Sequence, residues 1–194
     1  MYNDKLHCGV LCDYDLSISR RHPRVPGTDR TGTIPFMAVE LLTDKYWNGS
    51  LERLYQHELE AFIWILPFVF LRYQHGKPQP RTLVEQWMTS NYIVCREKKN
   101  DFQSTDHLRE KRLLCQPDFI DHWELVQSLL LWRGQISSTA LEQMDESGVT
   151  SDSSVASIWP FFVQRLRLVA KRFPTHLSYV AKLVDDLGLE NLLT

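Results

Sequence analysis

The sequence has few of the features that mark secreted or metal-binding proteins. It has four cysteines in 194 residues, with no Cys-x-x-Cys pair and no histidine cluster beside them. Cys8 and Cys12 would point to the same face of a strand, which allows a metal pair, but burial as small apolar side chains is favoured. After Met1 there is neither a basic stretch nor an apolar run of a secretory signal. We therefore expect an intracellular protein, in the cytoplasm or the nucleus.

Long apolar runs and a strong charge of one sign are also missing. The most apolar run, AFIWILPFVFL at 61–71, is about half as long as a membrane span. The formal net charge of −2 provides no field that would attract nucleic acid or a membrane surface. We expect neither as a partner, and the sequence leaves the oligomeric state open.

Hydrophobic residues make up 43 % of the chain, which is enough for a folded core. At the start, HCGVLC at 7–12 predicts a strand, which could be the second arm of a hairpin. Residues 17–35 are rich in Ser, Arg, Pro, Gly and Thr and predict a loop. FMAVELL at 36–42 predicts a short helix.

The strongest periodicity predicts a long helix over residues 51–71, with Ser50 as its N-cap. Its apolar residues recur every three or four positions in the first half and lie on all sides in the second half. A helix that is apolar all round is buried on every side. We therefore expect Phe62, Trp64 and Phe68 to lie in the core.

Beyond residue 80 the pattern is helical. It predicts helices at 82–91, 105–115, 118–133, 157–172 and 176–193. The proline before Asp118 makes this aspartate a plausible cap for the third of them.

A polar, acidic stretch of small residues at 136–156 predicts a flexible surface segment. It separates residues 1–135, which hold the strand and most of the helices, from residues 157–194, whose helices we expect to pack on the same lobe. The sequence has no internal repeats.

Three stretches form a recognisable pattern because of the order in which they occur. They are CDYDLS at 12–17, TGTIPFMAVE at 31–40 and YQHELEAFIWIL at 55–66. Together they resemble the D-F-G motif, the end of the activation segment and the central helix of a protein kinase. Their particular spelling is similar to the fungal-type protein kinase family. The resemblance covers about residues 8–72 well and the later helices loosely.

The resemblance implies a mainly α fold, a protein kinase-like C-lobe fragment. It would have a short N-terminal β-hairpin or strand, then an activation segment and a helical bundle around a central buried helix. In the full-length family, the aspartate at the strand end holds the Mg²⁺ that bridges the ATP phosphates, and Asp13 occupies that position here. Thr33 matches the threonine that steadies the catalytic aspartate and the substrate-binding loop.

The resemblance also assigns regulatory and structural positions. Thr28 and Thr31 stand beside arginines, where a phosphate could order the loop through arginine pairing. Glu40 matches the structural glutamate that pairs with a buried arginine, for which Arg133 is the candidate. Glu58 stands where the central helix often has an aspartate that anchors the catalytic loop.

Besides Glu58, two positions depart from the family pattern. Asp15 replaces the usual glycine of the first motif, and aspartate tolerates left-handed backbone less freely than glycine does. Val39 replaces the proline that usually stands between the alanine and the glutamate.

Several parts of a kinase are not found in the sequence. There is no Gly-rich phosphate loop, no strand lysine in the expected context and no H-R-D catalytic loop. We therefore expect the C-terminal portion of a Ser/Thr-type kinase domain that acts on a protein substrate, with Mg²⁺ and ATP not bound by this chain alone. The alternative is a non-enzymatic, pseudokinase-like helical module that binds a partner protein.

Overall fold

Two short strands pair near the start of the chain. In the computed structural model, β1 (Tyr2–Asn3) and β2 (Cys8–Gly9) are antiparallel, with Tyr2 opposite Gly9 and Asn3 opposite Cys8. They belong to the first of two compact units, Met1–Gly32 and Thr33–Thr194. The hairpin expected around residues 7–12 is therefore present. The structure describes residues 2–3, 8–9, 32–104, 108, 110–134, 155–174, 178–180 and 182.

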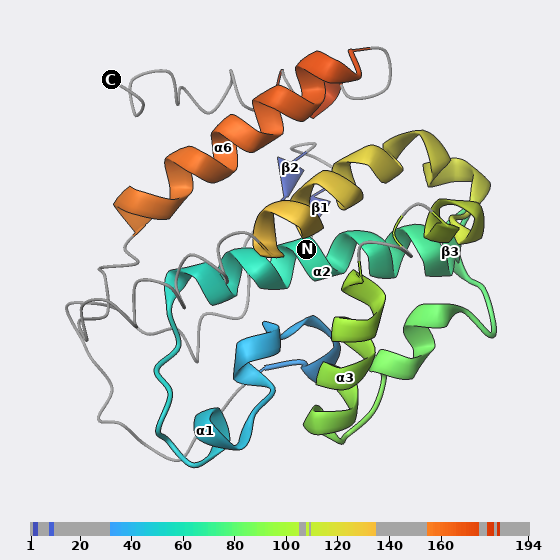
Figure 1. The fold of residues 1–194 in the computed structure, drawn as a ribbon. Coiled ribbons are helices and arrows are strands. Elements are labelled where there is room, and N and C mark those ends of the chain that lie inside the picture. Colours follow the sequence, from blue (N-terminus) through green and yellow to red (C-terminus); the bar gives the residue numbers. More distant parts are fainter. Residues whose placement is uncertain are drawn as a thin grey trace. The chain divides into compact units, whose positions relative to one another are not determined.

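A long helix, α2 (Tyr55–Arg72), is the element around which the second unit is built (Figure 1). It contacts the short helical turns before and after it in the sequence, and also α6 (Val155–Arg172). The helix begins at Tyr55 and not at the predicted Ser50 cap. The backbone N–H of Leu54 donates to Nδ1 of His57 at 2.9 Å, so a histidine side chain completes the first turn.

The core position of α2 is confirmed for two of its three predicted anchors. Trp64 is fully buried and Phe68 is 8 % exposed. Phe62, however, is 62 % exposed, and Ile65 is 37 % exposed. The prediction that Phe62 lies in the core is wrong, because a helix can be apolar all round without having a neighbour on every side.

Residues 33–42 form two 3₁₀ turns where one short helix was predicted. These turns are η2 (Ile34–Phe36) and η3 (Val39–Leu41), and α1 (Asp44–Trp47) follows them. Between the turns, Met37 and Ala38 are extended, with ψ angles of 146° and 145°. This extended step points backbone groups of the segment away from one another, so that they bond to side chains of other helices.

After α2 the chain makes a small hairpin. Strands β3 (Tyr73–Gln74) and β4 (Lys77–Pro78) are antiparallel and are joined through His75 and Gly76, which have φ angles of 49° and 73°. The carboxylate of Asp118 accepts a hydrogen bond from the backbone N–H of His75 at 2.8 Å. Asp118 therefore ties this turn to a distant segment and is not the helix cap that its sequence context predicted.

The helix α3 (Tyr92–Gln103) was missed by sequence analysis, which ended one helix at 91 and began the next at 105. Its N-cap is Asn91, whose side chain accepts from the backbone N–H groups of the second and third residues of the helix. The buried positions are Cys95, Lys99 and Phe102, a four-three spacing in which a lysine replaces an apolar residue. The turn η4 (Leu83–Trp87) lies in the place of the predicted helix over 82–91.

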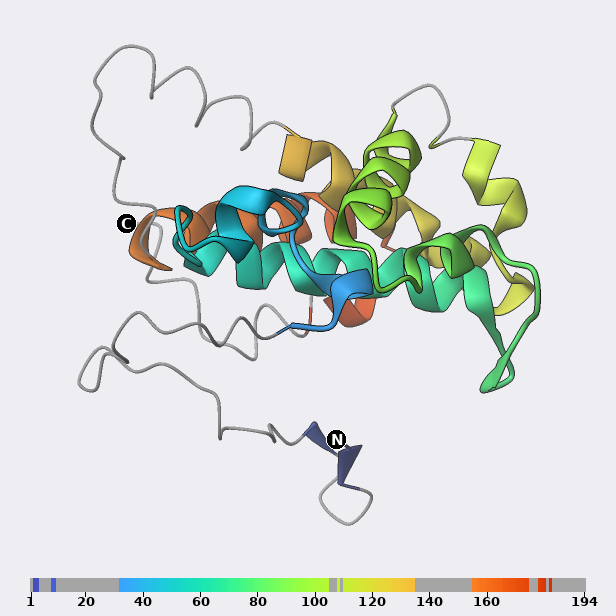
Figure 2. The ribbon, with the colours of Figure 1, turned by 90° about the horizontal axis from the view of Figure 1, so that it is seen from below.

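The described elements after α3 are helical, as predicted, while the helix predicted at 176–193 lies almost entirely outside the described residues. They are η5 (Glu110–Leu114), η6 (Pro117–His122), a helix at 123–134 and α6. The helix predicted at 157–172 is α6, which begins two residues earlier. Figure 2 shows α6 and the helix at 123–134 beside α2, with residues 33–42 close to the same helix. The described part of the chain is thus mainly helical, and none of its helices is long and apolar enough to cross a membrane.

Candidate functional site

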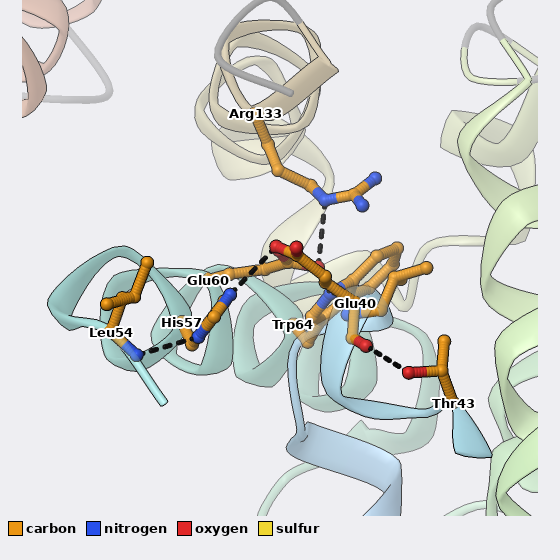
Figure 3. A network of polar contacts seen from close by, with 8 residues as sticks. Glu40, Thr43, Leu54, His57, Glu60, Trp64 and Arg133 are labelled. Carbon is orange, nitrogen blue, oxygen red and sulfur yellow. Dashed lines mark hydrogen bonds and ion pairs between the residues drawn. The ribbon is translucent and has the colours of Figure 1, made fainter. Parts of the chain in front are cut away.

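The candidate site is built on residues 33–42, which we call the anchored segment. These residues include the end of the motif at 31–40, and side chains of α2 and α3 bond to their backbone. Figure 3 shows the contacts on the α2 side, where His57, Glu60 and Trp64 lie one or two turns apart on one face of the helix. The fold therefore brings together two of the motifs, the one at 31–40 and the one at 55–66.

Glu60 is the central acceptor of this network. Its Oε1 accepts from the backbone N–H of Val39 at 2.8 Å and from the indole Nε1–H of Trp64 at 2.9 Å. The same oxygen is paired with Nε of Arg133, 2.8 Å away, which comes from the helix at 123–134. Glu60 is only 8 % exposed, so its charge is compensated inside the fold.

This arrangement accounts for one of the departures from the family pattern. A proline at position 39 would have no N–H to donate. Val39 does have one, it is buried, and Glu60 supplies its acceptor. A buried backbone N–H without an acceptor would destabilise the fold, so valine at position 39 requires an acceptor such as Glu60.

Glu40 is held by His57. Because Nδ1 of His57 accepts from Leu54 N–H, the neutral ring carries its hydrogen on Nε2, which donates to Oε2 of Glu40 at 2.9 Å. This hydrogen bond lowers the pKa of Glu40 below its usual value, and partial burial opposes the shift. The backbone oxygen of Glu40 accepts from the hydroxyl of Thr43 at 2.9 Å. Glu40 thus links the anchored segment to the first turn of α2.

The partner predicted for Glu40 needs correction. We expected it to point inward to an arginine, with Arg133 as candidate. Instead, the Glu40 side chain is 53 % exposed and pairs with His57, whereas Arg133 pairs with Glu60. Arg133 still lowers the pKa of Glu40 through its charge. The buried ion pair is therefore made by Glu60 of α2, whose side chain is buried beside Arg133, and not by the half-exposed Glu40 of η3.

A second polar anchor, Lys99, reaches the segment from α3. Its Nζ donates to the backbone oxygen of Met37 at 2.6 Å, and the residue has no exposed surface. The ammonium lies 4.7 Å from the ring centre of Trp64 and 5.9 Å from that of Trp87. Burial lowers the pKa of Lys99 to about 7. Sequence analysis missed this residue; the signal was its position in line with Cys95 and Phe102.

The remaining predicted site residues are Thr33, Glu58, Asp13, Thr28 and Thr31. Thr33 is exposed at the start of η2, where its backbone oxygen, and not its side chain, accepts from Phe36 N–H at 2.8 Å. Glu58 forms an ion pair with Arg53, including a contact of 3.1 Å from Nη2 to Oε2. Asp13, Thr28 and Thr31 lie outside the described residues.

A cleft of about 430 Å³ lies elsewhere on the second unit, between η4, α3 and η5. Trp87 and Phe102 form part of its wall, and Leu113 and Leu114 line it while remaining 83 % and 56 % exposed. Across the described ranges, no group of three His, Cys, Asp or Glu side chains is placed to hold a metal ion.

Comparison with known proteins gives one match. Residues 2–70 match the family described as fungal protein kinase. Neither a curated protein nor a solved structure matches the chain. The matched range holds the N-terminal strand pair, the anchored segment and nearly all of α2.

Proposed function

We propose, from the relationship of residues 2–70 to the fungal protein kinases, that this chain is the C-terminal portion of a fungal-type Ser/Thr protein kinase domain. In this proposal, its substrate in the complete enzyme is a protein. The observation that carries the proposal is the attachment of the anchored segment to α2 by Glu60 and His57. A kinase needs the end of its activation segment fixed to the helical lobe, because that end positions the substrate beside the transferred phosphate.

Within the complete enzyme, each motif position has a proposed role. Asp13 would hold the Mg²⁺ that supplies charge neutralisation at the ATP phosphates, and its carboxylate is the hard oxygen ligand that Mg²⁺ prefers. Thr33 would steady the catalytic aspartate and the substrate-binding loop, and Glu58 would anchor the catalytic loop. Phosphate on Thr28 or Thr31 would order the loop before the anchored segment. The enzyme would work in the cytoplasm or nucleus.

The 194-residue chain by itself should not transfer phosphate. Its sequence has no Gly-rich loop, no ATP-binding lysine in strand context and no H-R-D catalytic aspartate. Phosphoryl transfer depends on positioning and electrostatic stabilisation, and these groups supply most of both. A single carboxylate at Asp13 would hold Mg²⁺ only weakly.

The test uses radiolabelled ATP and a generic protein substrate with the purified chain. We expect no transfer of label and no binding of ATP at micromolar concentration. The matched control is Asp13→Ala, which removes the proposed metal ligand. Transfer that this substitution abolishes would show that the chain is an enzyme in itself and would overturn the proposal for the isolated chain.

A second function, a pseudokinase-like module that binds a partner protein, is favoured by the cleft beside α3. Its exposed leucines, Leu113 and Leu114, are apolar groups of the kind that a partner covers. The coding sequence upstream of Met1 separates the two functions. An in-frame Gly-rich loop and H-R-D motif would decide for the kinase, whereas translation that starts at Met1 would favour the module.

A further inference from the structure

The attachment of the anchored segment to α3 depends on a charged group in an unusual position. Lys99 has no exposed surface, yet its Nζ donates to the backbone oxygen of Met37 and lies over the rings of Trp64 and Trp87. Aromatic faces and a carbonyl oxygen favour an ammonium ion, but they do not replace the water that it loses. The hydrogen bond from Lys99 to Met37 therefore holds the anchored segment on α3, but it requires that the ammonium group be removed from water.

The other charged or titratable groups that act on Lys99 come from three helices. Glu60 of α2 and Cys95 of α3 favour its charged form, and Arg133 of the helix at 123–134 disfavours it. Burial outweighs the attraction, so the pKa of Lys99 falls to about 7. Burial also raises the pKa of the Cys95 thiol, so the thiolate that would attract the ammonium is disfavoured.

Release of the anchored segment would remove the carbonyl of Met37 and open one side of the lysine site. In water the amine regains its ordinary affinity for a proton. Between pH 7 and the ordinary lysine range, the released state then binds more protons than the closed state. As the pH falls through this interval, proton uptake by the released state increasingly favours release. Below the pKa of Lys99 in the closed state, both states are protonated and the equilibrium no longer depends on pH.

We propose that the anchored segment is released from the core by proton uptake at Lys99, which makes this lysine a pH-sensitive clamp on residues 33–42. The proposal does not rest on the proposed kinase function, because it concerns contacts within the described fold. It assigns a conformational role to a residue that carries no motif signal. In a complete enzyme it would couple intracellular pH to the order of this segment.

Hydrogen exchange of the full 194-residue chain tests the clamp. The reporters are backbone amides of the segment that are hydrogen-bonded in the fold: Phe36, Met37, Val39, Leu41 and Leu42. After correction for intrinsic exchange, their protection factors should rise about tenfold per pH unit from pH 7 to pH 9. From pH 6 to pH 7 they should stay level. The helix at 123–134 should be better protected at every pH, since it stays folded when the segment opens.

The matched variant is Lys99→Met, which keeps a long side chain in the cage and removes the titrating group. Its segment amides should show no pH slope. A slope that survives in this variant, or level protection factors in the natural chain, would overturn the proposal. So would equal protection of the segment and the helix at 123–134, because release would then be global unfolding.

A second measurement does not depend on whether the variant folds. Nuclear magnetic resonance of the lysine side chains in the natural chain, with each signal assigned to its residue, should find that Lys99 titrates near pH 7. If Lys99 titrates in the ordinary lysine range, the clamp is excluded.

Discussion

On the side of α2 that faces the anchored segment, His57 and Glu60 are buried although both are polar. On another side of the same helix, Phe62 and Ile65 are 62 % and 37 % exposed although both are apolar. The two sides differ in what the fold places beside them. Backbone groups of the anchored segment lie beside the first side and need hydrogen-bond partners there. Polar side chains on α2 are therefore found where neighbouring backbone groups require hydrogen-bond partners, and not only where the helix is exposed to water.

The largest effect expected from this comparison is the difference between Trp64 and Phe62, two aromatic residues in the same turn of α2. Trp64→Ala should destabilise the fold by about 3–5 kcal/mol, because it empties a fully buried site and removes the donor to Glu60. Phe62→Ala is the matched control and should change the free energy of unfolding by no more than about 0.5 kcal/mol. Urea unfolding of both variants is the measurement. Similar losses would mean that Phe62 is covered in solution.

The next effect concerns the two glutamates that bind the anchored segment. Glu60→Ala leaves Val39 N–H and the Trp64 indole without their acceptor and Arg133 without its ion-pair partner, so we expect a loss of about 3–5 kcal/mol. Glu40→Ala should lose about 1–2 kcal/mol, because only the buried Nε2–H of His57 is left without an acceptor.

Thermal or urea unfolding of these two variants decides which glutamate is the main anchor. A larger loss for Glu40→Ala would restore the sequence-based assignment, in which Glu40 is the glutamate of the buried ion pair. Glu60→Gln sharpens the result, since it keeps an acceptor for Val39 and Trp64 and removes only the charge opposite Arg133.

An effect comparable to that of Glu40→Ala is expected for Val39→Pro, which returns the usual residue of the kinase motif. The backbone allows it, because Val39 is the first residue of η3 and the preceding Ala38 has a ψ angle of 145°. The substitution removes one hydrogen bond to a carboxylate, so we expect a loss of about 1–2 kcal/mol. In the Glu60→Gln background the loss should shrink. A proline that stabilises the chain would contradict the proposed match between Val39 and Glu60.

Much of the fold could be predicted because local pattern was strong. The strand at Cys8–Gly9 within the predicted 7–12, the long helix ending near residue 71 and the helix over 157–172 all follow from local patterns. The helix α3 was missed because most of its residues are polar or charged. Its buried lysine, Lys99, occupies a position at which an apolar residue would have revealed the helical periodicity. The helix predicted over 36–42 became two turns, since Val39 N–H and Met37 C=O between them bond to distant side chains instead of continuing one helix.

The candidate site was only partly within reach of the sequence. The motif order singled out residues 12–17, 31–40 and 55–66, and the fold brings residues 33–42 and α2 together. The arginine partner was assigned to Glu40 of η3, whereas Arg133 pairs with the buried Glu60 of α2, because burial of a side chain depends on which elements pack beside it.

Residue types and their local spacing were enough for the mainly helical class of the fold, the order of the motifs and the match of residues 2–70 to the family described as fungal protein kinase. These depend on local spacing and residue type, which are properties of the chain before it folds. The folded arrangement alone pairs Glu60 with Arg133 and His57 with Glu40, and encloses Lys99 between two tryptophans. Such contacts join residues between 12 and 73 positions apart, and their energies depend on burial, which no local pattern contains.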